Sequence, residues 1–186
     1  TWLAQLAAGA QPVKVVVLTG PESSGKTRLA AHLQERFGGL RVDEYVREYI
    51  EQVQRDTCYA DIEPIAREQL RREDLARAEQ PPLLLLDTHL LSNLLWSRTL
   101  FGQAPVWLEA ALGQRQYHLH LLLAADGMPW QADGQRCQPL LAQRQHFEAQ
   151  CRAWLQAKGL PFSELTGHWA ARCQMAEQQV ACLLGC

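Results

Sequence analysis

Short apolar runs alternate with amphipathic stretches along the chain. Five apolar runs have the length of a β-strand and are bounded by glycine, proline or charged residues: 13–19, 40–43, 83–87, 117–123 and 160–165. Apolar residues recur at helical spacing in the stretches 28–37, 44–54, 62–80, 139–158 and 169–184, and a short stretch at 2–8 is a further candidate helix. This alternation predicts an α/β fold in which a five-stranded parallel sheet carries helices on both faces, giving three layers.

The segment that joins the first strand to the first helix, 20–27 (GPESSGKT), matches the phosphate-binding pattern GxxxxGK[ST]. The strand and helix around it matter, because backbone N–H groups and the helix N-terminus must converge on one anion. Lys26 is expected to reach the β- and γ-phosphates as a catalytic residue, and the Thr27 hydroxyl to ligate Mg²⁺. A plain turn with a solvated lysine is the competing interpretation. We predict a P-loop NTPase fold that binds ATP through Gly20, Glu22, Ser23, Ser24, Gly25, Lys26 and Thr27.

The third apolar run, LLLLD at 83–87, ends in Asp87. A buried parallel strand delivers such a carboxylate to the sheet edge where the phosphate loop lies, so this run resembles a Walker B strand. We expect Asp87 to be catalytic and to hold Mg²⁺ together with Thr27. An alternative role for Asp87, compatible with the first, is to cap a helix that begins at Thr88.

The second strand runs into the charged sequence DEYVRE at 43–48. Its position at the same sheet edge suggests an acceptor site next to the phosphates. Glu44 is then the general base, and Tyr45 and Arg47 shape the acceptor pocket. The plainer interpretation is an amphipathic helix whose charges are exposed to solvent.

An irregular segment broken by glycines and holding Trp, Asp and Arg follows the fourth strand, and residues 126–146 are interpreted as a lid. Arg136 and Arg144 are candidates to bind the nucleotide phosphates, because phosphoryl transfer depends on charge neutralisation. Each arginine could instead lie on the surface. From residue 139 onward, a helix is expected to place Leu140, Phe147 and Cys151 on its buried face.

Composition narrows the range of partners. The chain has 186 residues, enough for one domain at 1–186, and its formal net charge of -2 provides no basic field for nucleic acid or an anionic membrane. The six cysteines show no CxxC pair, and the longest uncharged apolar run is far too short to cross a bilayer, so a cytoplasmic protein is expected. The chain begins at Thr1 rather than at methionine, which suggests a domain excised from a longer protein.

The motifs GPESSGKT, EYVRE, LLLLDT with Trp96 downstream, and PWQADGQR together resemble the ribosylnicotinamide kinase domain of NadR-type NAD-salvage proteins, over nearly the whole chain. The resemblance implies an adenylate-kinase-like P-loop fold and the ATP-dependent phosphorylation of the 5′-hydroxyl of nicotinamide riboside, which gives nicotinamide mononucleotide. It further implies Glu44 and Arg47 in the acceptor region, Asp87 near Mg²⁺, and Trp130, Asp133 and Arg136 in the lid. Indole stacks well on a cationic pyridinium, so Trp130 is a candidate for binding the substrate together with Asp133; alternatively, Trp130 pins the lid to the core.

The chain departs from the family pattern at His89, where family members commonly carry a second acid after Asp-Thr. The acceptor therefore stays open among nicotinamide riboside, another nucleoside and another small metabolite. The runner-up function is a regulatory ATPase or nucleotide-sensing module built on the same loop. The proton acceptor also stays open between Glu44, Asp43 and Asp87.

Overall fold

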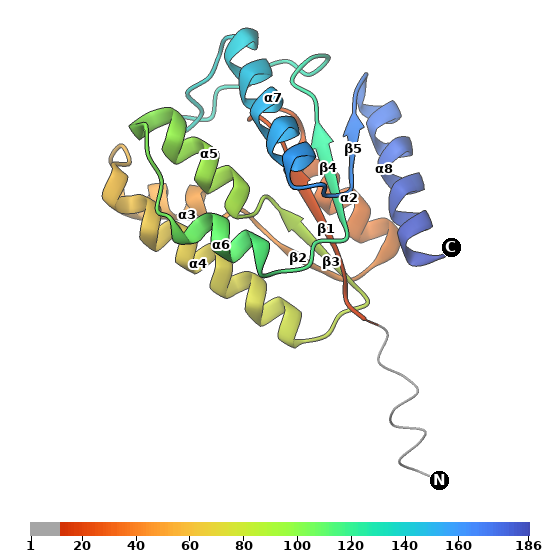
Figure 1. Cartoon of the computed structure of the whole chain (residues 1–186). Coiled ribbons are helices and arrows are strands. Elements are labelled where there is room, and N and C mark those ends of the chain that lie inside the picture. The colour runs from red at the N-terminus through yellow and green to blue at the C-terminus, as the bar shows by residue number, and fades with distance from the viewer. Residues whose placement is uncertain (1–11) are drawn as a thin grey trace.

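A computed structural model describes residues 12–186, and its centre is a five-stranded sheet in which every strand pairing is parallel. The strands lie in the order β2-β3-β1-β4-β5 (Figure 1). Their bounds are β1 Lys14–Thr19, β2 Leu40–Val42, β3 Leu83–Asp87, β4 Leu119–Leu123 and β5 Phe162–Leu165. The five predicted strands and their parallel arrangement are confirmed.

Helices cover both faces of this sheet, which explains why its central strands read as unbroken apolar runs. Alternate residues of one strand face opposite layers: Val15 and Val17 pack in one core, and Val16 and Leu18 pack in the other. The first core is closed by α4, α5 and α7, and the second by α2 and α8. The helices are α2 Lys26–Phe37, α3 Tyr45–Val53, α4 Tyr59–Ala78, α5 Leu90–Phe101, α6 Trp107–Gly113, α7 Leu141–Ala157 and α8 Trp169–Leu184.

Two helices begin at other residues than expected, and one short helix was not predicted. The helix α4 begins at Tyr59, earlier than its apolar period indicates, because the Asp61 carboxylate accepts the Cys58 N–H at 2.8 Å and caps the first turn. The short helix α6 has too few residues to show a period. The helix α7 begins at Leu141, so Leu140 lies before it and is 62% exposed, contrary to the prediction. The candidate helix at 2–8 lies outside the described residues.

The phosphate loop begins between the carboxyl ends of β3 and β4. Leu18 of β1 is in register with Asp87 of β3, which places that acid beside the beginning of the loop. On the other side, a Cβ atom at Gly20 would lie 2.5 Å from the Leu123 carbonyl oxygen of β4. Only glycine fits there, and its φ of 128° also favours glycine.

A buried arginine joins the loops at this sheet edge. The guanidinium of Arg172, in α8, donates to the carbonyl of Gly167 at 2.8 Å and to that of Ala124 at 2.8 Å. It also donates to the carbonyls of Asp126 and, at 3.4 Å, Ser24. Arg172 therefore ties the phosphate loop to the segments that follow β4 and β5, and no sequence motif had indicated it.

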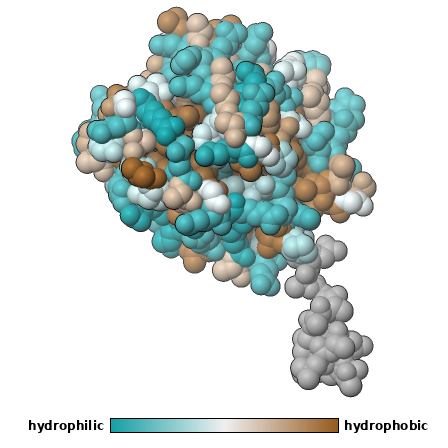
Figure 2. Space-filling model, in the orientation of Figure 1, coloured by the Kyte–Doolittle hydropathy of each residue, from teal (hydrophilic) through white to brown (hydrophobic). Residues whose placement is uncertain are grey.

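The surface of the molecule is mostly polar. On the face shown in Figure 2, hydrophilic residues cover most of the area and hydrophobic residues are scattered among them. Isolated apolar residues of this kind are usual on protein surfaces. Within residues 12–186, no helix combines the length and apolar character needed to cross a membrane.

Candidate active site

The phosphate loop folds into an anion-binding cup at the start of α2. Gly25 caps this helix with φ of 93°, so the first N–H groups of α2 face the loop. The Ser24 hydroxyl donates to the Pro21 carbonyl at 2.8 Å, and the Lys26 ammonium donates to the Pro21 carbonyl at 2.7 Å. Backbone carbonyls of the loop thus hold the Lys26 side chain over the loop, close to where phosphate oxygens would lie.

The side chains of Thr27 and Asp87 contact each other next to the phosphate loop. The Thr27 hydroxyl donates to Oδ2 of Asp87 at 2.6 Å, while the other carboxylate oxygen, Oδ1, is buried and has no hydrogen-bond partner within residues 12–186. Burial raises the pKa of Asp87, and the hydrogen bond from Thr27 and the nearby Lys26 oppose that rise. The helix α5 begins at Leu90 with His89 as its N-cap, so the alternative role of Asp87 as a helix cap is wrong.

This pair fits a magnesium ion. A hydroxyl and a carboxylate oxygen are ligands that Mg²⁺ prefers, and the cation usually takes its remaining ligands from phosphates and water. Within the described part of the chain, no three His, Cys, Asp or Glu side chains cluster as a complete metal site. Thr27 and Asp87 would therefore hold Mg²⁺ jointly with a bound nucleotide.

Glu44 and Arg47 lie at the beginning of α3, near the phosphate loop. Glu44 is the N-cap of α3, and its side chain is 23% exposed. Burial raises the pKa of Glu44, the positive charge of Lys26 opposes this, and the negative charge of Asp87 adds to it. Arg47 lies between two acids, with its Nε 3.7 Å from Glu44 and its Nη1 donating to Asp133 at 2.6 Å.

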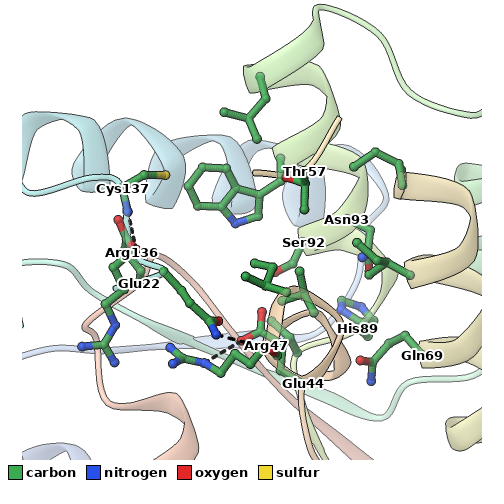
Figure 3. Close-up of a pocket in the computed structure, with 18 residues that line it drawn as sticks. Glu22, Glu44, Arg47, Thr57, Gln69, His89, Ser92, Asn93, Arg136 and Cys137 are labelled. Atoms are coloured by element: carbon green, nitrogen blue, oxygen red, sulfur yellow. Dashed lines mark hydrogen bonds and ion pairs between the residues drawn. The ribbon is translucent and has the colours of Figure 1, made fainter. Parts of the chain in front are cut away.

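A cavity extends from these charged groups between α3, α4 and α5 (Figure 3). Charged side chains from the phosphate loop, α3 and the lid lie along one side of it. The rest of the wall is apolar or neutral, and the Trp96 ring, which packs 5.1 Å from the Phe147 ring, is its aromatic surface. The cavity is lined by Glu22, Glu44, Val46, Arg47, Ile50, Thr57, Ile62, Ile65, Gln69, Thr88, His89, Ser92, Asn93, Trp96, Leu100, Gln135, Arg136 and Cys137.

The lid is fastened to the phosphate loop by two of the loop's own side chains. The Glu22 carboxylate accepts the backbone N–H of Cys137 at 3.2 Å and that of Gln138. The Ser23 hydroxyl oxygen accepts the backbone N–H of Gln131 at 3.1 Å. Both residues are expected to contact ATP as part of the phosphate loop, and in this structure their side chains also hold the lid. Since α7 begins at Leu141, the irregular lid also ends earlier than the predicted residue 146.

Asp133 organises the tip of the lid. Its Oδ1 accepts the backbone N–H groups of Gln135 at 3.0 Å and Arg136 at 2.9 Å, and its Oδ2 lies 3.2 Å from Nε of Arg136. Burial raises the pKa of Asp133, but the hydrogen bonds from Arg47 and the two backbone N–H groups outweigh it and lower the pKa to about 2. Arg136, which donates to the Gln131 carbonyl at 2.7 Å, is thereby held at the cavity wall.

Outside the phosphate loop and β3, four predicted site residues do not line the cavity: Asp133, which contacts Arg47 as described above, and Tyr45, Trp130 and Arg144. Tyr45 packs against the Arg72 guanidinium, whose carbon lies 4.5 Å from the ring centre. The indole Nε1 of Trp130 is buried without a hydrogen-bond partner in the described residues, and Trp130 does not line the cavity. Arg144 is buried and donates to the Met128 carbonyl at 3.4 Å, so it supports the base of the lid.

The cavity is also lined by residues to which the sequence analysis assigned no role in the site. His89, Ser92, Asn93, Trp96 and Leu100 all line it from α5 or its N-cap. His89, Asn93, Trp96 and Leu100 recur every three or four residues, which places them on one helix face, and Ser92 lies beside Asn93. This spacing could have indicated the cavity face from the sequence. However, α5 also carries apolar residues on its other faces, so no single face stands out in the pattern.

The fold and the site together define a P-loop protein of the kinase-like type. A family model described as an AAA domain matches residues 15–172, and the chain belongs to this family. The resemblance to NadR-type proteins is confirmed: the chain is 26% identical over 140 residues to the trifunctional NAD biosynthesis/regulator protein NadR of Escherichia coli (strain K12). That match covers 73% of this chain and 34% of the relative, so the chain spans about a third of the relative's length.

Solved structures agree on the fold. A NadR protein in complex with NR matches with a TM-score of 0.75 at 19% identity, covering 94% of this chain and 52% of that chain. Deoxyadenosine kinase from M. mycoides matches with a TM-score of 0.62 at 11% identity, covering 90% of this chain and 99% of that one. Thymidylate kinase from Ehrlichia chaffeensis matches with a TM-score of 0.62 at 10% identity, covering 94% of this chain and 100% of that one.

Proposed function

We propose that the protein is an ATP-dependent small-molecule kinase that phosphorylates the 5′-hydroxyl of nicotinamide riboside and releases nicotinamide mononucleotide. One observation carries the proposal: Glu44 lines a cavity and is also close enough to Lys26 and Asp87 for their charges to shift its pKa. A single carboxylate therefore connects the phosphate cup with an acceptor chamber. A bare NTPase does not require such a chamber.

The roles of the residues follow from charge and position. Lys26 and Arg136 neutralise the transferring phosphoryl group, which is the main requirement of this reaction. Glu44 accepts the proton of the acceptor hydroxyl, a role that its raised pKa favours because a base works best when its pKa lies closer to the operating pH. Magnesium, held by Thr27 and Asp87 with the nucleotide, would supply further charge neutralisation. Arg47 orients Glu44 from 3.7 Å away.

The cavity wall suits a nucleoside with a flat, cationic base. Trp96 presents an indole to the cavity, and indole attracts a cation placed over its face. The E. coli relative is a NAD biosynthesis protein, and a NadR protein has been solved with NR. The six cysteines are all free thiols, which is consistent with a cytoplasmic enzyme.

The test is a panel of nucleosides incubated with the protein and Mg·ATP. We expect ADP release that depends on nicotinamide riboside, with one nicotinamide mononucleotide formed for each ADP and no release from Lys26→Ala. Release that is no faster with any acceptor than with water contradicts a kinase. Turnover that is independent of acceptors and responds to a protein partner supports the regulatory ATPase, and preference for another nucleoside, as in the deoxyadenosine kinase of similar fold, corrects the substrate.

A further inference from the structure

Charge is distributed unevenly around the cavity. Glu22, Glu44, Arg47 and Arg136 are the charged lining residues among those the structure describes, and they come from the phosphate loop, the start of α3 and the lid. In Figure 3, Glu22, Arg136 and Arg47 lie on one side, while Thr57, Ser92 and Asn93 lie on the other. An acceptor whose hydroxyl meets Glu44 would therefore place its far end against a wall without charge.

That far wall offers neutral hydrogen-bonding groups. Ser92 and Asn93 are on the first turn of α5, and within residues 12–186 neither side chain makes a hydrogen bond. The Gln69 amide also lines the cavity, but its oxygen already accepts the Tyr45 N–H at 2.8 Å. The first turn of α5 thus offers one hydroxyl and one amide to contact an acceptor beside the Trp96 ring.

His89 does not supply a positive charge at this wall. It is 1% exposed, and its ring lies 4.8 Å from the Tyr117 ring and 5.3 Å from the His120 ring. Both ring nitrogens are buried and have no hydrogen-bond partner within the described residues, so neither reaches an acceptor in the cavity. The cations that line the cavity are Arg47 and Arg136, which lie on its other side.

We infer that Ser92, Asn93 and Trp96 determine acceptor specificity by recognising a base that carries a neutral amide, and that they reject a base that carries a carboxylate. The inference rests on the proposed function and names the substrate class of the same site. A carboxamide can both accept and donate hydrogen bonds at this wall. A carboxylate would lose its water there and meet no cation, which is strongly unfavourable.

The experiment compares nicotinamide riboside with nicotinic acid riboside, which shares the pyridinium ring and ribose but carries a carboxylate in place of the carboxamide. We expect kcat/KM to favour the carboxamide by about 100-fold, in line with sites that leave a buried polar group unpaired. A ratio of tenfold or more supports the inference, and a smaller ratio overturns it while leaving the kinase assignment intact. If neither riboside is phosphorylated, the proposed function fails and this inference fails with it.

Two substitutions of one residue locate the discrimination. Asn93→Arg places a guanidinium at the wall and is expected to reduce the ratio at least tenfold, because a carboxylate then finds a charged partner. Asn93→Leu, the matched control, removes the amide without adding charge and is expected to slow the carboxamide substrate with no gain for the carboxylate. For each variant, kcat/KM for the two ribosides is measured on the same preparation. A partly unfolded variant lowers both values by the same factor, so their ratio is unaffected. An unchanged ratio in Asn93→Arg contradicts the role of this wall.

Discussion

Glu44 and Asp87 are two acids with raised pKa values in the same site, yet their surroundings differ. Asp87 accepts the hydrogen bond of Thr27 and is almost fully buried. Glu44 lies at the cavity, with its side chain 23% exposed. At the scale of single residues, this difference supports the proposal that Asp87 binds the metal and Glu44 accepts the proton.

Glu44→Gln tests that assignment. The amide keeps the size of the side chain but cannot take up a proton, so phosphoryl transfer should fall by about 10²- to 10⁴-fold while the dissociation constant of ATP stays nearly unchanged. The neighbouring Asp43 provides a matched control, because its carboxylate is exposed and pairs with Arg41 at 2.8 Å. Transfer rates that fall in Asp43→Asn and not in Glu44→Gln would move the base to Asp43.

The same substitution has a second consequence, for stability. Because burial raises the pKa of Glu44 in the folded state, its contribution to stability is present below the unfolded-state pKa and is lost as the pH rises through the folded-state pKa. At pH 7 the raised pKa of Glu44 therefore opposes folding, and Glu44→Gln should raise Tm, by about 2–4 °C for each kcal/mol regained. The difference from wild type should shrink at pH 4. Thermal unfolding at both pH values measures it, and a lower Tm for the variant at pH 7 contradicts the expectation.

At the scale of elements, the lid is held from two sides. Glu22 and Ser23 fasten its backbone to the phosphate loop, and Arg47 fastens Asp133 to α3. The phosphate loop and the helix that begins after Glu44 therefore share one cover. In the proposed kinase, a cover over both substrates would exclude water from the transferring phosphoryl group.

Glu22→Ala should loosen this cover. The variant removes the hydrogen-bond acceptor of the two backbone N–H groups that follow Arg136. Arg136 is then positioned less firmly, so kcat should fall by about 10- to 100-fold. Cleavage by protease within residues 126–140 should become faster. Glu35→Ala, an exposed acid on α2, is the control and should change neither quantity. Wild-type cleavage rates in Glu22→Ala would show that the lid is held elsewhere.

At the scale of the whole molecule, Arg172 connects segments that are far apart in the chain. Its hydrogen bonds reach the phosphate loop, the end of β4 and the turn before α8. Each carbonyl it contacts belongs to a loop at the carboxyl edge of the sheet. The shape of the phosphate cup therefore depends on a helix near the end of the chain.

Arg172→Met keeps most of the buried volume and removes the donors. Several buried carbonyls then lack a partner, so unfolding should become easier by about 3 kcal/mol, which corresponds to a fall in Tm of about 6–12 °C. ATP affinity should fall as well, because the Ser24 carbonyl loses its support. The exposed Arg36 supplies the control, since Arg36→Met should leave Tm within about 1 °C. Calorimetry and ATP titration measure both effects, and an unchanged Tm contradicts the bridging role.

Local patterns were enough to predict the five strands, the phosphate loop and the acid of β3. Each depends on neighbouring residues: a period of two or 3.6, glycines at set positions, or an acid at the end of an apolar run. Parallel strands then bring their carboxyl ends to one edge, so Lys26, Glu44 and Asp87 were expected to lie near one another. Their mutual influence on the pKa of Glu44 agrees with this expectation.

Only the tertiary structure decided which side chains of the lid and of α5 face the cavity. Glu22 meets Cys137 across more than a hundred residues, and the irregular lid has no period from which such a contact could be read. Trp96 lines the cavity whereas Trp130 does not, although both follow recognisable motifs. The direction of a side chain in an irregular segment depends on long-range packing and hydrogen bonds, and these exist only when the whole chain has folded.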